Sequence, residues 1–222
     1  MTTICCVSDL HGYLPEIPDC DLLLIAGDIV PLWAQNQLDI SAVWLDTNFR
    51  NWLEAIKRRK IDVVGIAGNH DFVLERGEHP KNLPWTYLQD KRFEFNGLKI
   101  YGTPWQPYFG GWAFNLYEEQ LSEKWDLIPQ DTDIIIVHGS PYQHGDFVFY
   151  IKDGHGYEEN VGSPSLLRKI QEIQPKLVVC GHIHGGYGIY QVGKTIVINC
   201  SLVNERYKPV NNPVVWTVGE NQ

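Results

Sequence analysis

Short apolar segments recur along the chain and are separated by longer stretches in which polar residues predominate. Each segment has the length and the β-branched composition of a buried strand. Seven such strands are predicted, at residues 4–7, 22–26, 62–67, 133–137, 177–180, 195–199 and 214–218. The hydrophobic pattern therefore predicts a fold with one or more largely buried sheets.

Two helices and a hairpin are predicted between these strands. Apolar residues recur at helical spacing within residues 39–59, which indicates an amphipathic helix. Ser163 followed by Pro164 has the composition of a helix start, and Pro175 ends the apolar pattern that follows. Asn96-Gly97 between two strand-like segments is a strong hairpin signal. The order of elements predicts a layered α/β fold with helices covering central sheets.

Composition and charge narrow the class of protein. The 222 residues are 44% hydrophobic and 20% charged, which is typical of a folded globular protein rather than a disordered or fibrous one. No linker or internal repeat divides the sequence, so we expect a single domain over residues 1–222. Eighteen Lys and Arg against 27 Asp and Glu give a formal net charge of −9, which disfavours duplex nucleic acid and anionic membranes as partners.

The apolar runs, the N-terminal residues and the cysteines indicate the cellular compartment. No apolar run approaches the roughly 20 residues that a membrane span requires, and the N-terminus has no signal-peptide pattern. The five cysteines are odd in number and form no C-x-x-C pair, which argues against a disulfide framework or a zinc knuckle. We therefore expect a cytoplasmic protein with reduced thiols.

Residues of metal-binding types follow five of the predicted strands at their C-terminal ends, where open α/β sheets bind ligands. Taken singly, each residue could be an ordinary turn residue or a buried histidine, but one shared site explains all five strand ends together. Carboxylate, imidazole and amide oxygen suit a pair of divalent ions, and seven ligands are too many for one tetrahedral zinc. The candidate ligands are Asp9, His11, Asp28, Asn69, His138, His182 and His184.

The motifs D-x-H, G-D, G-N-H-D, H-G-S-P and G-H-x-H, in this order, resemble the signature of the calcineurin-like metallophosphoesterase superfamily. Residues 101–115 and 175–189 further resemble its metallophosphoesterase-domain (MPPED) branch. The resemblance implies a four-layer α/β/β/α sandwich with two divalent ions, for which Mn, Fe, Zn, Co and Ni are candidates and Mn is favoured. Carried over by position, one ion binds Asp9, His11 and His184, the other binds Asn69, His138 and His182, and Asp28 bridges them.

The resemblance also implies a reaction. A hydroxide bridging the ions would attack phosphorus in line, and His70 would assist the leaving group as the catalytic residue. Asp71 is left out of the catalytic set because adjacent side chains often point apart. Phosphoprotein phosphatases follow the bridging aspartate with Asp-Arg-Gly, whereas Asp28 is followed by Ile-Val-Pro-Leu-Trp. Without that arginine a singly charged phosphodiester fits better than a phosphoserine.

We therefore expect a metal-dependent phosphodiesterase that hydrolyses small phosphoesters or nucleotides. Two alternatives stay open: a nucleotide-binding or scaffold protein of the same fold with negligible turnover, and a nuclease, although the charge indicates no basic groove. The aromatic residues between 105 and 114 could stack a nucleobase, but such runs more often form a core or an oligomer contact, so a homo-oligomer also stays open. The Gly-rich stretch at residues 143–162 could overhang the site as a rim.

Overall fold

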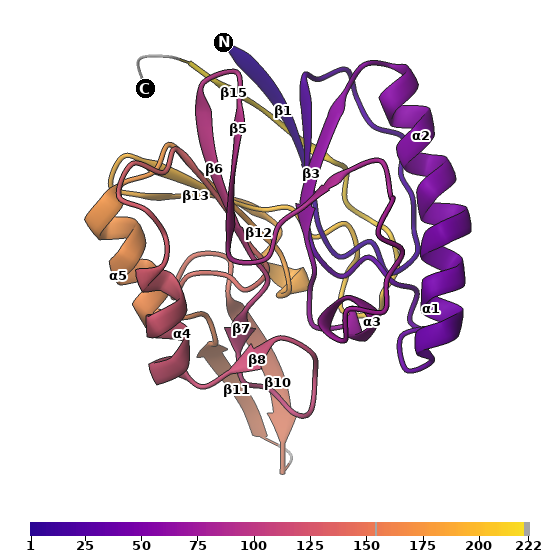
Figure 1. Ribbon diagram of the computed structural model, residues 1–222. Helices are drawn as coiled ribbons and strands as arrows, with labels where there is room; N and C mark the ends of the chain where they lie inside the picture. The colour runs from indigo at the N-terminus through magenta and orange to yellow at the C-terminus, as the bar shows by residue number, and fades with distance from the viewer. Residues whose placement is uncertain (154, 220–222) are drawn as a thin grey trace.

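The computed structural model describes residues 1–153 and 155–219, which form two β-sheets packed face to face between two layers of helices (Figure 1). In the first sheet the strand order is β15-β1-β2-β3-β4. Its central strands are parallel and almost entirely buried, as their continuous apolar sequences require. The bounds are β1 (Thr2–Val7), β2 (Leu22–Ala26), β3 (Asp62–Ile66), β4 (Thr86–Tyr87) and β15 (Val214–Val218), which is antiparallel to β1.

The second sheet has the order β13-β14-β12-β9-β6-β5. Its four inner strands are parallel, and a hairpin adds an antiparallel strand at each edge. The predicted Asn96-Gly97 turn is confirmed, with both residues at positive φ (49° and 78°), and the hairpin forms one edge of this sheet. The bounds are β5 (Lys91–Phe95), β6 (Leu98–Thr103), β9 (Ile134–Val137), β12 (Leu177–Cys180), β13 (Gly188–Val192) and β14 (Thr195–Asn199).

Helices cover the outer face of each sheet. The helix predicted within residues 39–59 is present as α1 (Leu38–Trp44), a π-helical segment at Leu45–Phe49 and α2 (Arg50–Arg58), which lie against the first sheet. The predicted helix after Ser163 is α5 (Pro164–Ile173), and it covers the second sheet together with α4 (Glu118–Asp126). Ser163 Oγ accepts the Leu166 backbone N–H at 3.1 Å and caps α5 as expected.

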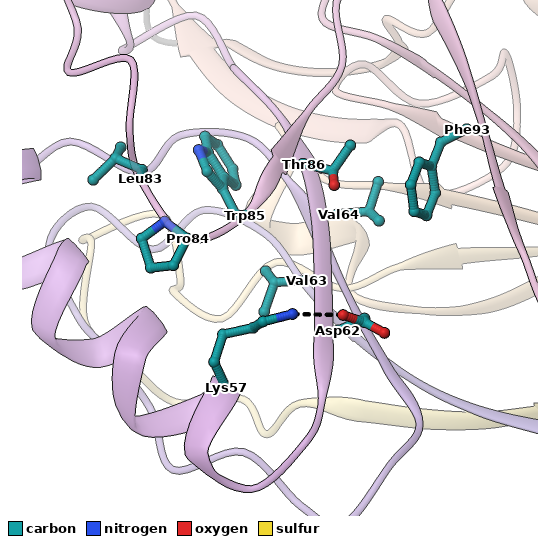
Figure 2. Close-up of a pocket in the computed structure, with 9 residues that line it drawn as sticks. All are labelled: Lys57, Asp62, Val63, Val64, Leu83, Pro84, Trp85, Thr86 and Phe93. Atoms are coloured by element: carbon teal, nitrogen blue, oxygen red, sulfur yellow. Dashed lines mark hydrogen bonds and ion pairs between the residues drawn. The ribbon is translucent and has the colours of Figure 1, made fainter.

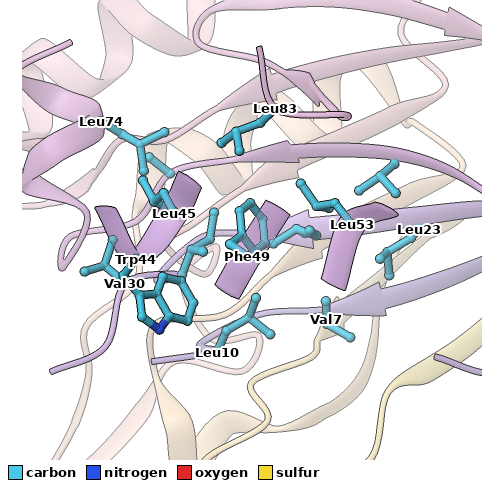
Figure 3. Packing of buried hydrophobic residues seen from close by; sticks show 14 of the residues in the cluster. Val7, Leu10, Leu23, Val30, Trp44, Leu45, Phe49, Leu53, Leu74 and Leu83 are labelled. Atoms are coloured by element: carbon cyan, nitrogen blue, oxygen red, sulfur yellow. The ribbon is translucent and has the colours of Figure 1, made fainter. Parts of the chain in front are cut away.

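Three apolar clusters fill the spaces between these layers. The first packs Leu45, Phe49 and Leu53 of the helical segment against the first sheet (Figure 3). The second lies between the sheets, and the third joins the second sheet to Trp125 and Ile170 of the other helical layer. Three clusters separate four layers, so the predicted α/β/β/α sandwich is confirmed.

Several short elements complete the fold. α3 (Phe72–Glu75) follows β3, β7 (Gln106–Pro107) pairs with β8 (Asn115–Leu116), and a 3₁₀ turn covers His184–Gly186. The Gly-rich stretch at residues 143–162 contains the antiparallel pair β10 (Phe147–Lys152) and β11 (His155–Asn160), which extends from the lower end of the molecule in Figure 1. Among the described residues, none of the helices is long and apolar enough to cross a membrane.

Candidate metal centre

The loops after β1, β2, β3, β9 and β12 bring all the predicted site residues into one cluster. Asp9, Asp28 and His138 are at most 1% exposed, and Asn69 and His70 are 4% and 5% exposed. Three overlapping groups of side chains have ligand atoms within 4.8 Å of one another: Asp9, His11 and His184; His11, Asp28 and His70; and Asp9, Asp28 and His138. Five strand ends that are distant in sequence therefore meet at one buried polar site.

The amide of Asn69 connects the remaining histidines to this cluster. Its Oδ1 atom lies 2.9 Å from His138 Nε2 and 2.7 Å from His182 Nδ1. The backbone N–H of His182 donates to the Asp9 carboxylate at 3.0 Å. The G-H-x-H motif therefore contributes one histidine on the Asn69 side of the cluster and another, His184, on the Asp9 side, 3.3 Å from Asp9 Oδ1.

The backbone is strained where it presents these side chains. Asp9, His11, Asp28 and His182 all have positive φ, between 42° and 67°, in the left-handed region that residues with a Cβ rarely adopt. Each such residue costs on the order of 1–3 kcal/mol, and strain of this kind gathers at functional sites. The surrounding hydrogen bonds and packing must therefore hold these residues in place.

Burial and neighbouring charges shift the pKa values of the carboxylates and imidazoles in the cluster. Burial raises the pKa of Asp28, but His138, whose Nε2 lies 3.4 Å away, together with His70 and His11 outweighs burial and holds that pKa well below its usual range. Burial alone would lower the pKa of His138, yet Asp28 raises it to about 9. In contrast, burial lowers the pKa of His11 to about 4 and that of His182 to about 3. These two imidazoles are neutral near pH 7 and present lone pairs, as metal ligands must.

The ring of His11 shows that the residues fit a metal ion. Its side chain is 1% exposed, and neither ring nitrogen has a hydrogen-bond partner among residues 1–153 and 155–219. Nε2 lies 3.7 Å from Asp28 Oδ2 and 4.0 Å from Asp9 Oδ1, too far for hydrogen bonds. An unpartnered buried group of this kind costs about 1–3 kcal/mol. A divalent cation between the ring and the carboxylates would supply the missing partner.

Backbone carbonyl groups fix the orientation of two other histidines. His138 Nδ1 donates to the Ala26 carbonyl oxygen at 2.8 Å, and His184 Nδ1 donates to that of Asn204 at 3.0 Å. Each ring therefore turns Nε2 toward the cluster, the arrangement that outer-shell partners give to metal-binding histidines. Ser201 Oγ also donates to Asp9 Oδ2 at 2.7 Å. Sequence reasoning did not find Ser201 or Asn204, because they follow β14 and belong to no recognisable motif.

Aromatic rings pack against the histidines of the cluster. Trp112 packs against His70 with ring centroids 4.3 Å apart, so one residue of the aromatic segment does reach the site. Trp105 instead donates through Nε1 to Asp90. Tyr207, which the sequence did not suggest, lies with its ring centroid 4.9 Å from that of His11. Trp112 and Tyr207 therefore contribute aromatic rings to the surroundings of the site.

Asp71 has a role that its position beside His70 does not reveal. Its buried carboxylate accepts the backbone N–H groups of Ile29 and Val30, each at 2.9 Å, and of Gly68 at 2.8 Å. Burial, followed by the charge of Asp28, raises its pKa to about 7. The carboxylate therefore ties the loop after β2 to the loop after β3.

A separate cavity of about 290 Å³ lies away from this cluster (Figure 2). It is lined by the start of β3, by the β4 segment and by Lys57, which pairs with Asp62 at 2.5 Å. The cluster residues follow the opposite end of β3 and do not line this cavity. The cavity is therefore separate from the cluster of candidate ligands.

Comparisons with known proteins agree with this geometry. Residues 2–186 match the model of the calcineurin-like phosphoesterase family. The chain is 35% identical to human metallophosphoesterase domain-containing protein 1, covering 96% of this chain and 70% of that protein. It is 31% identical to a UPF0046 protein of Caenorhabditis elegans, covering 96% and 59%.

Solved structures show the same fold. TT1561 of Thermus thermophilus aligns with a TM-score of 0.53 at 14% identity, covering 89% of this chain and 88% of that one. A second structure aligns with a TM-score of 0.60 at 16% identity, covering 89% and 90%. At such identities the likeness concerns the fold alone.

The resemblance inferred from the motifs, including that to the MPPED branch, is confirmed by these matches. The family and the Asp/His cluster together support a metal-dependent phosphoesterase that binds divalent cations and acts on a phosphoester. The chain belongs to the calcineurin-like phosphoesterase family.

Proposed function

We propose that the chain is a phosphodiesterase whose centre holds two divalent ions, with manganese as the favoured metal. The observation that carries this proposal is the position of Asp28 between the two groups of ligands. Its Oδ2 atom lies 3.7 Å from His11 Nε2 on one side and 3.4 Å from His138 Nε2 on the other. One ion would be held by Asp9, His11 and His184, the other by Asn69, His138 and His182, and both by Asp28.

His70 is the residue we assign to the leaving group. When bound, the ions would supply positive charge for the phosphoryl oxygens and activate the attacking water. His70 Nε2 lies 3.9 Å from Asp28 Oδ2, and the His70 backbone N–H donates to Asp28 Oδ1 at 2.8 Å. The ring is thus next to the bridging carboxylate but outside both proposed ligand groups. It can donate a proton to the departing oxygen without leaving a metal ion.

The loop after Asp28 supports a diester over a phosphoprotein substrate. Residues 29–33 contain no arginine, and the loop is held by hydrogen bonds from Ile29 and Val30 to Asp71. A singly charged diester needs fewer positive groups beyond the metal ions than a phosphoserine dianion does. The net charge of −9 disfavours a duplex nucleic acid as substrate.

We also propose that residues 1–222 form a single domain, of which residues 154 and 220–222 lie outside the described structure. The pairing of β15 with β1 supports this, because a strand near residue 218 completes the sheet that starts at residue 2. The segment between β14 and β15 contributes Ser201, Asn204 and Tyr207 to the surroundings of the site.

A hydrolysis assay tests the proposed function. Protein freed of metal with a chelator and reconstituted with Mn²⁺ should hydrolyse bis-p-nitrophenyl phosphate faster than p-nitrophenyl phosphate. Asp28→Ala should remove most of this activity. His70→Ala should slow the hydrolysis of an alkyl diester such as glycerophosphocholine by at least about 100-fold, because an alkoxide leaving group requires a proton.

The control is His155→Ala, which changes an exposed histidine in β11 and should leave the activity unchanged. Equal activity of wild-type and Asp28→Ala protein, or no turnover with any of Mn, Fe, Zn, Co and Ni, would contradict the proposal. A scaffold protein would show no metal-dependent turnover, and a nuclease would cleave plasmid or single-stranded DNA, which the phosphodiesterase should leave intact.

A further inference from the structure

A glutamine far from His70 in sequence contacts the catalytic ring. The Nδ1 atom of His70 forms a hydrogen bond with Oε1 of Gln35, which lies in the loop between β2 and α1. With the amide in this orientation its oxygen can only accept, so Nδ1 carries the hydrogen. The other ring nitrogen, Nε2, faces the carboxylate of Asp28. The two nitrogens therefore have different surroundings, one facing an acceptor and one facing the metal centre.

The loop that carries Gln35 is held by its own hydrogen bonds. The backbone N–H groups of Ala34 and Gln35 both donate to the Pro31 carbonyl oxygen, at 2.9 and 3.0 Å. The Ala34 carbonyl oxygen accepts from Ser41 Oγ at 2.8 Å, and Ala34 and Ser41 are fully buried. This turn joins the loop to the first residues of α1 and fixes the position from which the glutamine side chain extends.

The same loop is tied to the loop that carries His70. Asp71, the residue after His70, accepts the backbone N–H groups of Ile29 and Val30. It also accepts the N–H of Gly68 at 2.8 Å, so one buried carboxylate connects both loops. His70 and Gln35 are consequently carried by two loops that are hydrogen-bonded to each other, and these bonds fix the distance between the ring and its acceptor.

The neighbouring rings restrict the plane of the His70 ring but do not determine which of its nitrogens faces the site. Trp112 lies against the His70 ring with a centroid distance of 4.3 Å, and His11 meets it edge-on at 4.7 Å. Rotation of the ring by 180° would keep these apolar contacts and exchange nitrogens for carbons at both positions. The hydrogen bond to Gln35 distinguishes the two orientations.

We propose that Gln35 is the positioning residue of His70, which it holds in the Nδ1–H form with Nε2 directed at the leaving oxygen. This inference rests on the proposed role of His70. In the step, the attacking oxygen bonds to phosphorus while the bond from phosphorus to the leaving oxygen breaks. The leaving oxygen takes the proton of Nε2 from the doubly protonated ring, and the neutral ring keeps Nδ1–H on Gln35. The neutral amide adds no charge beside the buried carboxylates.

Two substrates that differ in the leaving group separate a positioning role from a structural one. Glycerophosphocholine releases an alkoxide that needs a proton, whereas p-nitrophenylphosphorylcholine releases p-nitrophenolate, which needs none. Gln35→Leu should lower kcat about 10- to 100-fold on the first substrate and less than about threefold on the second, with KM and Mn²⁺ affinity unchanged. Gln35→Glu keeps an oxygen acceptor and should retain most of the activity. Gln37→Leu, an exposed glutamine of the same loop, is the matched control.

A second readout does not require turnover. In metal-free protein with ¹⁵N-labelled histidine, NMR should show His70 as the Nδ1–H tautomer, and Gln35→Leu should abolish that preference. An Nε2–H tautomer in the wild-type protein, or equal losses of kcat on both substrates, would overturn the proposal. A protein that hydrolyses neither substrate but shows the Gln35-dependent Nδ1–H form would instead overturn the proposed function and support the pairing of Gln35 with His70.

Discussion

Gly68, the residue before Asn69, offers a direct way to disturb the proposed metal centre. A Cβ atom added to Gly68 would lie 2.6 Å from Cε1 of His138 and 2.5 Å from the backbone nitrogen of Asp28, and closer still to Oδ1 of Asp28. The first separation is about 1 Å shorter than optimal contact between two carbon atoms. Because backbone and a buried ring cannot rotate away, Gly68→Ala must displace Asp28, His138 or the loop itself.

The size of the expected effect follows from that displacement. Binding sites require their groups within about 0.5 Å of the productive geometry. Disturbing the groups that orient metal ligands lowers affinity by about 10- to 100-fold. We predict that Gly68→Ala weakens Mn²⁺ binding by about this factor and lowers the free energy of unfolding by about 1–3 kcal/mol, as overpacking does. Calorimetric titration of metal-free protein measures the first quantity and urea denaturation the second.

Gly219→Ala is the control, since no heavy atom of the described chain lies within 4 Å of the methyl group that it would add. It should bind Mn²⁺ as the wild-type protein does. A folded Gly68→Ala protein with wild-type Mn²⁺ affinity would refute the reasoning, because it would mean that Asp28 and His138 can shift without consequence for the ion.

Three further predictions concern stability. Chelation should lower the free energy of unfolding, and Mn²⁺ at about 100 times its Kd should restore about 2.7 kcal/mol; equal urea midpoints with and without metal would contradict this. Tyr207→Ala removes a ring packed on His11 and should destabilise the metal-free protein by about 0.5–1.5 kcal/mol in urea, whereas Tyr207→Phe should not. Ser163→Ala removes the acceptor of the Leu166 N–H and should cost about 1–2 kcal/mol by the same measurement; a cost below about 0.3 kcal/mol would show that water replaces the cap.

The buried strands were predictable because their sequences are continuous apolar runs. Residues 22–26, 177–180 and 195–199 form buried strands with the predicted bounds, and residues 214–218 form the half-exposed edge strand β15, also with the predicted bounds. A strand covered on both faces needs apolar residues at every position, so the signal is local. The helix within residues 39–59 was predicted as one unit, but its centre is a π-helical segment, which depends on how its side chains meet the first sheet.

The pair β10 and β11 was not predicted from the sequence. β11 is mostly polar, whereas residues 147–151 of β10 form an apolar run like those of the predicted strands, although Phe149 and Ile151 are exposed. The edge strand β13 was also missed, because Gly188 and Gln191 interrupt its apolar sequence.

The residues of the candidate site also include some that the sequence predicted and some that it did not. Residues such as Asp9, Asn69 and His138 were found because each follows a recognisable strand end, and such ends meet at one edge of the sheets. Gln35 and Tyr207 were not found, because their contacts with the histidines depend on the path of loops rather than on any local pattern. The sequence thus predicted the proposed metal ligands but not the residues that contact them.

Anomalous diffraction from crystals grown with Mn²⁺ tests the central proposal most directly. We predict two peaks per chain, both in contact with Asp28, one next to His11 and His184 and the other next to His138 and His182. A single peak, or peaks that do not contact Asp28, would contradict the dinuclear centre.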